Sequence, residues 1–340
     1  MSENLPSYLT ISSDLQADLS ASIQAINPDK IAVLVDENTK RYCLPELNVT
    51  NYLILTIKSG ETEKTLATCQ SIWSQLTEAG FTRKSLLINL GGGVIGDMGG
   101  FIAATYKRGM AFINLPTTLL SQVDASIGGK LGVDFNGLKN HIGLFQEPNK
   151  VIIYPQFLKT LPSKELKSGF AEVIKHALIK DEAQWEFLSA QSFDSLRWDE
   201  IIPKSIAIKN GIVNQDPREH GLRKILNYGH TIGHAIETHL LKTSAPLLHG
   251  EAVALGMILE NEVAQKLGVL SSETSEKIRD YLNHIYQFPD ILPGYDVLAG
   301  YLKQDKKNDK KGIRFSLLKK AGMCTYDVLV EDTILREVLK

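Results

Sequence analysis

Short runs of branched apolar residues in the first half of the chain constrain its fold most strongly. Between two of these runs, residues 64–78 carry apolar side chains at helical spacing. Runs that are apolar on successive residues predict buried strands of a parallel sheet. Alternation of strand and helix predicts an open α/β domain, which binds ligands at the carboxyl ends of its strands. The predicted strands are residues 31–35, 52–57, 85–90, 111–115 and 151–154.

The second half of the chain has a different residue pattern. After about Pro155, long segments rich in Ala, Leu, Glu and Lys predict helices, and the next predicted strand comes only at residues 313–318. A chain of 340 residues is long enough for two domains. We therefore predict a Rossmann-like, mostly parallel α/β domain that binds a dinucleotide over residues 1–155. A mainly α-helical domain that binds metal and substrate follows over residues 156–340, with the active site in the cleft between them.

Composition excludes several classes of protein. The content of 43% hydrophobic and 22% charged residues is that of a soluble globular protein, and the net charge of -2 argues against a general nucleic-acid binder. The three cysteines lack CxxC spacing, which favours free thiols in a reducing compartment. No apolar run approaches the roughly 18 residues of a membrane span, and no targeting segment is recognisable. We expect a cytoplasmic protein without nucleic-acid or membrane partners.

Histidines cluster in the second half, where four of the eight fall between His230 and His249. His230 and His234 are four residues apart on a predicted helix, so their rings share one face, as zinc ligands do. A single histidine on a helix is more often a bystander, and we read His239 as one. Spacing alone favours His230 with His234 as metal ligands and leaves His249 for the substrate.

Glu172 offers a carboxylate that can complete such a site. It lies on a predicted helix with Lys175 three residues later, so both side chains share a face. The pair would then place a metal ligand and a substrate-binding cation side by side. The alternative is an exposed helical ion pair.

A glycine cluster follows the predicted strand 85–90. Gly91 to Gly100 contains a formal G-x-G-x-x-G, whose missing side chains let a pyrophosphate approach a helix start. The usual acidic residue about 20 positions downstream is missing, and the better candidate, Asp36, lies upstream. The cluster is therefore a dinucleotide site of non-standard layout or a tight turn. Thr117 and Thr118 either face the same cleft or cap a helix.

Scattered cations offer binding for an anionic small molecule. Lys130 is flanked by glycine and follows Asp124, a pairing that suits an anion beside a hydroxyl group. Each cation taken singly is more often a surface charge. The charge run at residues 303–312 is either a solvated turn or the source of a lysine that reaches the substrate. The other cations that can converge on a doubly anionic substrate are Arg108, Lys175, Lys209 and Arg223.

These segments together resemble the 3-dehydroquinate synthase family of sugar-phosphate cyclases over about residues 36–307. The departures are small: Pro217 stands where an acidic residue is usual, and the segment between His234 and His249 is slightly long. The motifs that carry the resemblance are GGGVIGD, PTTLL, VDASIGGK, GFAEVIK, GLRKILNYGHTIGHAIE and LHGEAVALGM.

The resemblance implies a role for each matching residue. It reverses the assignment from spacing, because it implies that Glu172, His230 and His249 hold Zn²⁺ or Co²⁺ and that His234 faces the substrate. Arg108 is implied to reach the active site of a neighbouring subunit, hence a homodimer. The implied catalytic and substrate-binding residues are Asp124, Lys130, Asn140, Lys175, Lys209, Arg223, Asn227, His234 and either Lys306 or Lys307. The implied NAD-binding residues are Asp36, Asn38, Glu61, Lys64, Gly92, Gly93, Val94, Asp97, Thr117, Thr118, Lys130, Lys139, Phe157, Leu158, Lys159 and Thr160.

The implied activity is a carbon–oxygen lyase reaction of the shikimate pathway of aromatic amino acid biosynthesis. In such enzymes 3-deoxy-D-arabino-heptulosonate 7-phosphate yields 3-dehydroquinate and phosphate through transient NAD oxidation, phosphate elimination, re-reduction and an intramolecular aldol step. The rival readings are another sugar-phosphate cyclase, a metal-dependent polyol dehydrogenase of the same fold, and a non-catalytic module that binds metal and nucleotide. The carboxylate-binding candidates Lys209 and Arg223 favour an acid substrate over a plain polyol.

Overall fold

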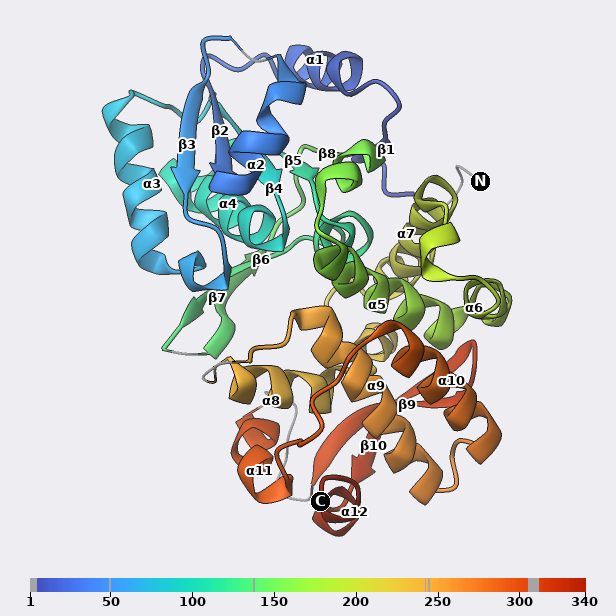
Figure 1. Ribbon diagram of the computed structural model, residues 1–340. Coiled ribbons are helices and arrows are strands. Elements are labelled where there is room, and N and C mark those ends of the chain that lie inside the picture. Colours follow the sequence, from blue (N-terminus) through green and yellow to red (C-terminus); the bar gives the residue numbers. More distant parts are fainter. Residues whose placement is uncertain (1–4, 49, 137, 242, 244, 305–311) are drawn as a thin grey trace. The chain divides into compact units, whose positions relative to one another are not determined.

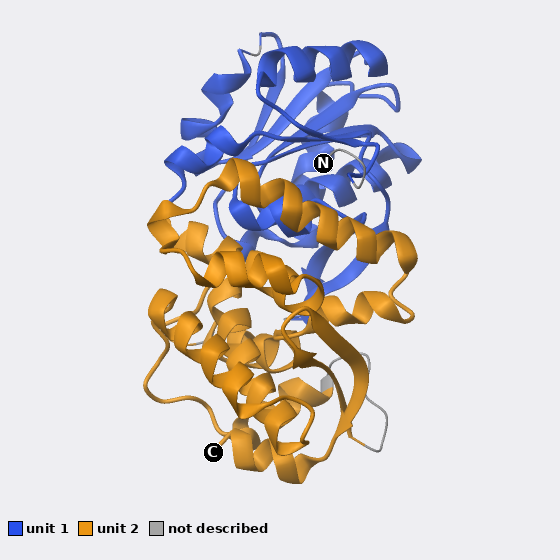
Figure 2. Cartoon of the chain, turned by 90° about the vertical axis from the view of Figure 1, so that its right-hand side faces the viewer, with its two compact units in different colours: residues 1–162 blue, residues 163–340 orange. Residues whose placement is uncertain are grey.

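The protein consists of two compact units, residues 1–162 and 163–340 (Figure 2). The structure is a computed structural model that describes residues 5–48, 50–136, 138–241, 243, 245–304 and 312–340. Within these residues, no helix combines the length and the apolar character that crossing a bilayer requires.

The first unit is built on a six-stranded parallel sheet of order β1-β8-β5-β4-β2-β3 (Figure 1). Its central strands are buried on nearly every residue, as expected for a parallel sheet with both faces covered. All five predicted strands are confirmed, and so is the predicted helix, which is α3. The strands are β1 (Leu9–Ile11), β2 (Ile31–Asp36), β3 (Leu53–Ile57), β4 (Leu86–Gly91), β5 (Ala111–Pro116) and β8 (Lys150–Ile153), and the helices are α1 (Leu15–Ile26), α2 (Glu37–Tyr42), α3 (Leu66–Glu78) and α4 (Gly93–Thr105).

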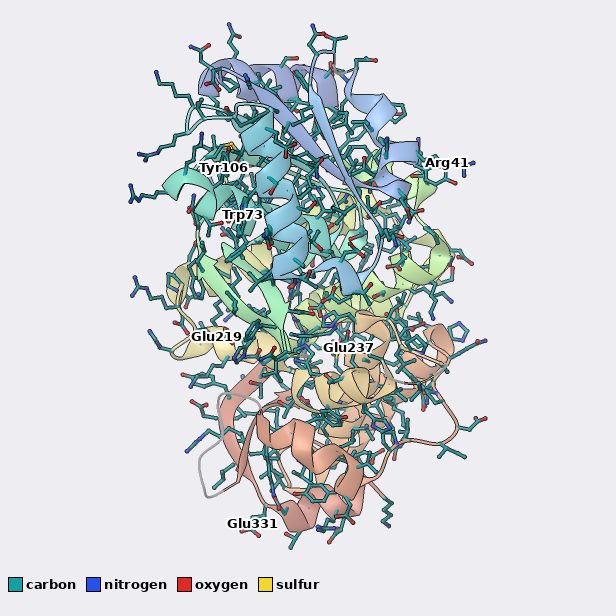
Figure 3. The ribbon with its side chains drawn as sticks, turned by 90° about the vertical axis from the view of Figure 1, so that its left-hand side faces the viewer. Arg41, Trp73, Tyr106, Glu219, Glu237 and Glu331 are labelled. Atoms are coloured by element: carbon teal, nitrogen blue, oxygen red, sulfur yellow. The ribbon has the colours of Figure 1, made fainter. Side chains whose placement is uncertain are left out.

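Helices cover both faces of this sheet. On one face, α3 and α4 pack through residues such as Ile72 and Met98, and the Trp73 indole N–H donates to the carbonyl of Ile102 at 3.2 Å (Figure 3). On the other face, α1 packs through Leu15 and Leu19. In sheets of this kind ligands bind at the carboxyl ends of the strands.

An antiparallel hairpin that sequence analysis missed follows the first unit's fifth strand. It consists of β6 (Lys130–Phe135) and β7 (Leu138–Phe145), and β6 packs against α4. Leu131 illustrates the contact, because a Cβ added to Gly100 would lie 2.4 Å from its Cδ2 atom. The hairpin therefore carries Lys130 and Asn140 on defined strands.

The second unit is mainly helical, as predicted. The strand predicted at residues 313–318 is confirmed as β9, and its antiparallel partner β10 was missed. Helix α8 packs against α9, and α9 also packs against α5. The elements are α5 (Ser163–Lys180), α6 (Glu182–Ser189), α7 (Trp198–Gln215), α8 (His230–Leu240), α9 (His249–Lys266), α10 (Ser272–Ile285), α11 (Tyr295–Gln304), α12 (Asp332–Val338), β9 (Ile313–Lys320) and β10 (Met323–Val330).

Candidate functional site

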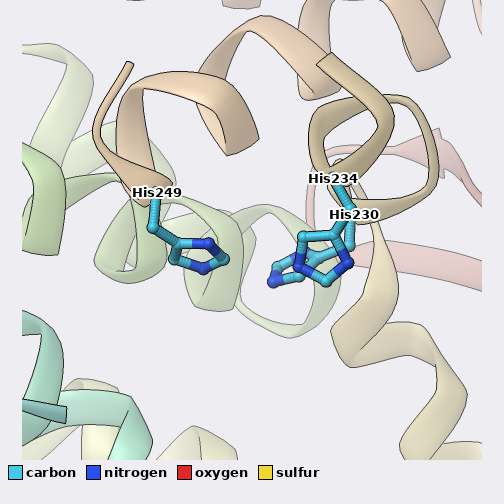
Figure 4. A group of neighbouring side chains, drawn as sticks. All are labelled: His230, His234 and His249. Atoms are coloured by element: carbon cyan, nitrogen blue, oxygen red, sulfur yellow. The ribbon is translucent and has the colours of Figure 1, made fainter. Parts of the chain in front are cut away.

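Three imidazole rings converge in the second unit (Figure 4). His230 and His234 lie one turn apart at the start of α8, and His249 is the first residue of α9. The ring centroids are 4.9 Å apart for His230 and His234, 5.4 Å for His230 and His249, and 5.6 Å for His234 and His249. One nitrogen from each ring lies within 4.8 Å of the others, a spacing that lets three donors share one metal ion.

A buried carboxylate from α5 lies between two of these rings. One oxygen of Glu172, Oε1, lies 3.4 Å from His230 Nε2 and 3.6 Å from His249 Nε2. Its other oxygen contacts the ammonium group of Lys175, which is also buried. One carboxylate oxygen and two imidazole nitrogens are a donor set that suits Zn²⁺ or Co²⁺, so these residues fit a metal ion.

Hydrogen bonds orient both of these imidazoles. His230 Nδ1 lies 3.1 Å from the carbonyl oxygen of Tyr228, which can only accept, so Nδ1 carries the proton and Nε2 is left for a metal. His249 Nδ1 lies 3.3 Å from Glu237 Oε2. Outer partners of this kind fix the ring orientation of metal ligands. Sequence analysis gave no role to Glu237 (Figure 3), although it shares a helix face with His234 at i+3.

The two imidazoles differ in their affinity for protons. Burial lowers the pKa of His230 well below its usual range, and the nearby Lys175 lowers it further. Burial also lowers the pKa of His249, but hydrogen bonds to Glu172 and Glu237 outweigh it and raise the value to about 10. The His230 imidazole is therefore neutral at neutral pH, whereas a metal ion bound at His249 would have to displace a proton.

Close contact between α8 and α9 sets the distance between the histidines. A Cβ added to Gly256 of α9 would lie 2.0 Å from the carbonyl oxygen of Gly229, just before α8. Gly229 has φ +80°, a conformation that glycine adopts at little cost. Glycine at both positions thus lets the two backbones approach.

We predict that Gly256→Ala destabilises the fold, because a methyl group at this position forces the two helices apart. Overpacking of this kind typically costs about 1–3 kcal/mol of unfolding free energy. Gly211→Ala on α7 is the matched control, since no atom lies within 4 Å of its added Cβ, and it is expected to be neutral or slightly stabilising. Urea unfolding of both variants checks this, and equal midpoints for Gly256→Ala and the wild type would contradict the tight contact.

Two predicted substrate-binding cations are buried in the second unit. Lys209 lies on α7, and Arg223 donates from Nη1 to the carbonyl of Pro217 at 2.6 Å. The Asp216 carboxylate accepts hydrogen bonds from three backbone N–H groups of the same loop. Burial acts to raise the pKa of Asp216, but these N–H groups prevail and lower it. Although Pro217 departs from the family pattern, the neighbouring Asp216 therefore still orders the loop through these hydrogen bonds.

Asn227 lies in the same segment and donates to Glu219 Oε1 at 2.6 Å. Sequence analysis gave Glu219 no role (Figure 3). Its position in the charged stretch Arg218-Glu219-His220 offered no periodic signal that would distinguish it from a surface residue.

In the first unit, predicted cofactor and substrate residues form a polar cluster. The buried ammonium group of Lys64 donates to Asp97 at 2.7 Å and to Asn140 at 2.6 Å. Lys139 lies 3.9 Å from Glu61. Five side chains from three segments that are distant in sequence are thus brought together by α4, the hairpin and the turn before α3.

The glycine cluster forms a pocket at the carboxyl ends of β4 and β5. Gly92 caps α4, and Thr117 donates its backbone N–H to the Gly91 carbonyl at 3.0 Å. At the end of β2, Asp36 caps α2 by accepting from the backbone N–H of Thr39 at 2.8 Å. The pocket is lined by Asn89, Gly91, Gly92, Gly93, Gly96, Asp97, Asn114, Pro116, Ser121, Ala125 and Ser126.

For the remaining predicted residues, the structure gives their burial and local contacts. Thr118 forms a local hydrogen bond with Ser121, as expected if it caps a helix. Arg108 is exposed and has φ +68°. Lys306 and Lys307 lie outside the described residues. Phe157 and Leu158 are buried, Asp124 and Val94 are half-buried, and Asn38, Lys130, Lys159 and Thr160 are exposed.

Comparison with known proteins identifies relatives over nearly the whole chain. Residues 54–168 match the family described as 3-dehydroquinate synthase N-terminal, and residues 169–308 match 3-dehydroquinate synthase C-terminal. The 3-dehydroquinate synthase of Parabacteroides distasonis is 39% identical, covering 97% of this chain and 94% of its own. That of Campylobacter jejuni subsp. doylei is 43% identical, covering 86% and 87%.

Solved structures share the fold. A 2-deoxy-scyllo-inosose synthase complexed with carbaglucose-6-phosphate, NAD⁺ and Co²⁺ superposes with a TM-score of 0.86 and 26% identity, covering 97% of this chain and 95% of its own. A protein described as a probable glycerol dehydrogenase from Sinorhizobium meliloti 1021 superposes with a TM-score of 0.59 and 13% identity, covering 98% of this chain and 95% of its own, and supports the fold alone.

Proposed function

Because the chain belongs to the 3-dehydroquinate synthase family, we propose that it converts 3-deoxy-D-arabino-heptulosonate 7-phosphate to 3-dehydroquinate and phosphate. We further propose that it uses NAD and one divalent ion, Zn²⁺ or Co²⁺. The observation that carries this proposal is the approach of one Glu172 oxygen to Nε2 of both His230 and His249. That approach supports His230 with His249 as the metal ligands, instead of His230 with His234.

When bound, the metal supplies a Lewis acid and NAD a reversible hydride acceptor. The chain's own residues bind and orient the substrate. Buried Lys175, Lys209 and Arg223 provide positive charge in the second unit, which suits a substrate bearing a carboxylate and a phosphate. His234 is exposed beside the metal ligands, so its imidazole can accept or donate a proton during phosphate elimination.

The first unit offers the proposed dinucleotide site. Glycines at the start of α4 leave its N–H groups accessible to a pyrophosphate, and the pocket they line also includes Asp97. Lys64 holds Asp97 in place. A shared cleft with the second unit, a homodimer that exchanges Arg108 and a cytoplasmic location stay predictions.

A phosphate-release assay tests the proposed activity. Purified protein with metal, NAD and the seven-carbon acid phosphate is expected to release one phosphate per carbocycle formed, without net NADH, because the hydride returns to the product. Steady NADH production from glycerol would indicate a polyol dehydrogenase, and release from another sugar phosphate alone would indicate a different cyclase. Glu172→Gln is the control, since it preserves the shape of the side chain but removes its charge.

A further inference from the structure

The peptide bond between Tyr228 and Gly229 joins a buried carboxylate to a metal-site histidine. Its carbonyl oxygen accepts from His230 Nδ1 at 3.1 Å, and its N–H donates to Glu260 Oε2 at 2.7 Å. The N–H and the C=O of one peptide thus form two linked hydrogen bonds, which connect Glu260 through the backbone to the imidazole of His230. Hydrogen bonds linked in this way polarise one another, and the effect is larger where water is excluded.

Glu260 is well placed to hold this peptide. It lies on α9, is fully buried, and its second oxygen accepts from the backbone N–H of Ile232 at 3.0 Å. Burial raises the pKa of Glu260 to about 8, whereas the N–H groups at the start of α8 lower it. Two oxygens that both accept are the arrangement of an ionised carboxylate. Above this pKa, Glu260 therefore places negative charge against the amino end of α8, where the helix dipole favours it.

The next residue of α9 holds the side chain of Tyr228, whose carbonyl belongs to the same peptide. Asn261 Oδ1 accepts from the buried hydroxyl of Tyr228 at 2.8 Å. Packing fixes the peptide further, because a Cβ on Gly229 would lie 2.6 Å from Met257 Cγ. The backbone carbonyl that faces His230 therefore has little freedom to move.

We propose that Glu260 is a positioning residue for the metal centre and acts on His230 through the Tyr228–Gly229 peptide. A stronger acceptor at Nδ1 fixes the tautomer and makes Nε2 a better metal donor. His249 receives equivalent support directly from Glu237. This inference rests on the proposed metal site but goes beyond the ligand set, since Glu260 accepts its hydrogen bonds from backbone N–H groups and not from a proposed ligand side chain.

The test compares metal affinity of Glu260→Gln and wild type by chelator competition with Zn²⁺ or Co²⁺, in a buffer above the pKa of Glu260. Loss of an outer partner typically weakens metal binding about 10–100-fold, and we expect a change in this range. The matched control is Glu262→Gln, two residues along α9, where the carboxyl interacts with Arg279 and Lys266. This control is expected to bind metal as the wild type does.

The outcomes separate the two proposals. Tight binding by the wild type with unchanged affinity in folded Glu260→Gln would overturn the role of Glu260 and leave the proposed function intact. Failure of the wild type to bind metal would overturn both. If Glu260→Gln does not fold, NMR of the uniformly ¹⁵N-labelled wild type decides: a proton on His230 Nδ1 with a strongly downfield Gly229 amide supports the linkage, and a proton on Nε2 overturns it.

Discussion

His230→Ala is expected to lose tight metal binding and nearly all turnover. The variant removes one of two imidazoles that face the buried Glu172 carboxylate, so this carboxylate keeps only His249 as a partner toward a metal ion. Loss of Lewis-acid stabilisation worth several kcal/mol corresponds to at least about 10³-fold in kcat/KM. Metal content after dialysis, together with phosphate release, measures both effects.

Two further alanine variants on α8 serve as matched controls. His234→Ala is expected to keep its metal and still lose about 10²–10⁴-fold in turnover, as removal of a general acid or base does. His239→Ala is expected to resemble the wild type, because its ring contacts Tyr301 rather than the histidine cluster. Metal loss in His234→Ala with metal retained in His249→Ala would instead support the ligand pair that spacing favoured.

Lys175→Met is expected to separate substrate handling from metal binding. The buried ammonium group of Lys175 contacts the Glu172 oxygen that faces away from the histidines, so methionine removes charge while filling similar space. Removing one preorganised donor from an active site typically costs about 10²–10³-fold in kcat, and we expect a loss in that range. Metal affinity should be retained or slightly increased, because one positive charge near the ion is gone.

Lys180→Met on the same helix is the control for this variant. Lys180 is exposed at the end of α5, so its replacement is expected to change neither turnover nor metal content. Steady-state kinetics with saturating metal make the comparison. Turnover by Lys175→Met within threefold of the wild type would contradict the proposed role of Lys175 in binding the substrate.

Local pattern predicted the parallel sheet well, and its failures have physical reasons. Strands such as β2 are apolar on successive residues, which is the pattern of a strand buried on both faces. The β6–β7 hairpin was missed because β7 has only exposed and half-buried positions and contains Lys139, Asn140 and His141. A polar strand at the edge of a small sheet leaves little periodic signal.

For the site, residue types and helical spacing placed His230 and His234 on one face, and the structure bears this out. Spacing along the sequence could not decide whether Glu172 and His249 belong to the site, because the distances between Glu172, His230 and His249 depend on how α5, α8 and α9 pack. The role of Glu260 could not be predicted from the sequence either. Glu260 directly follows the apolar run Val253–Leu259, but only the fold reveals that its carboxylate accepts from backbone N–H groups at the start of another helix.

The most direct test of the central claim is a crystal structure of the Co²⁺-loaded protein with the ion located by its anomalous scattering. We predict one ion bound by the Glu172 carboxylate and by Nε2 of His230 and His249, with His234 outside the coordination sphere. An ion held by the three imidazoles without Glu172, or no ion among these residues, would contradict the account.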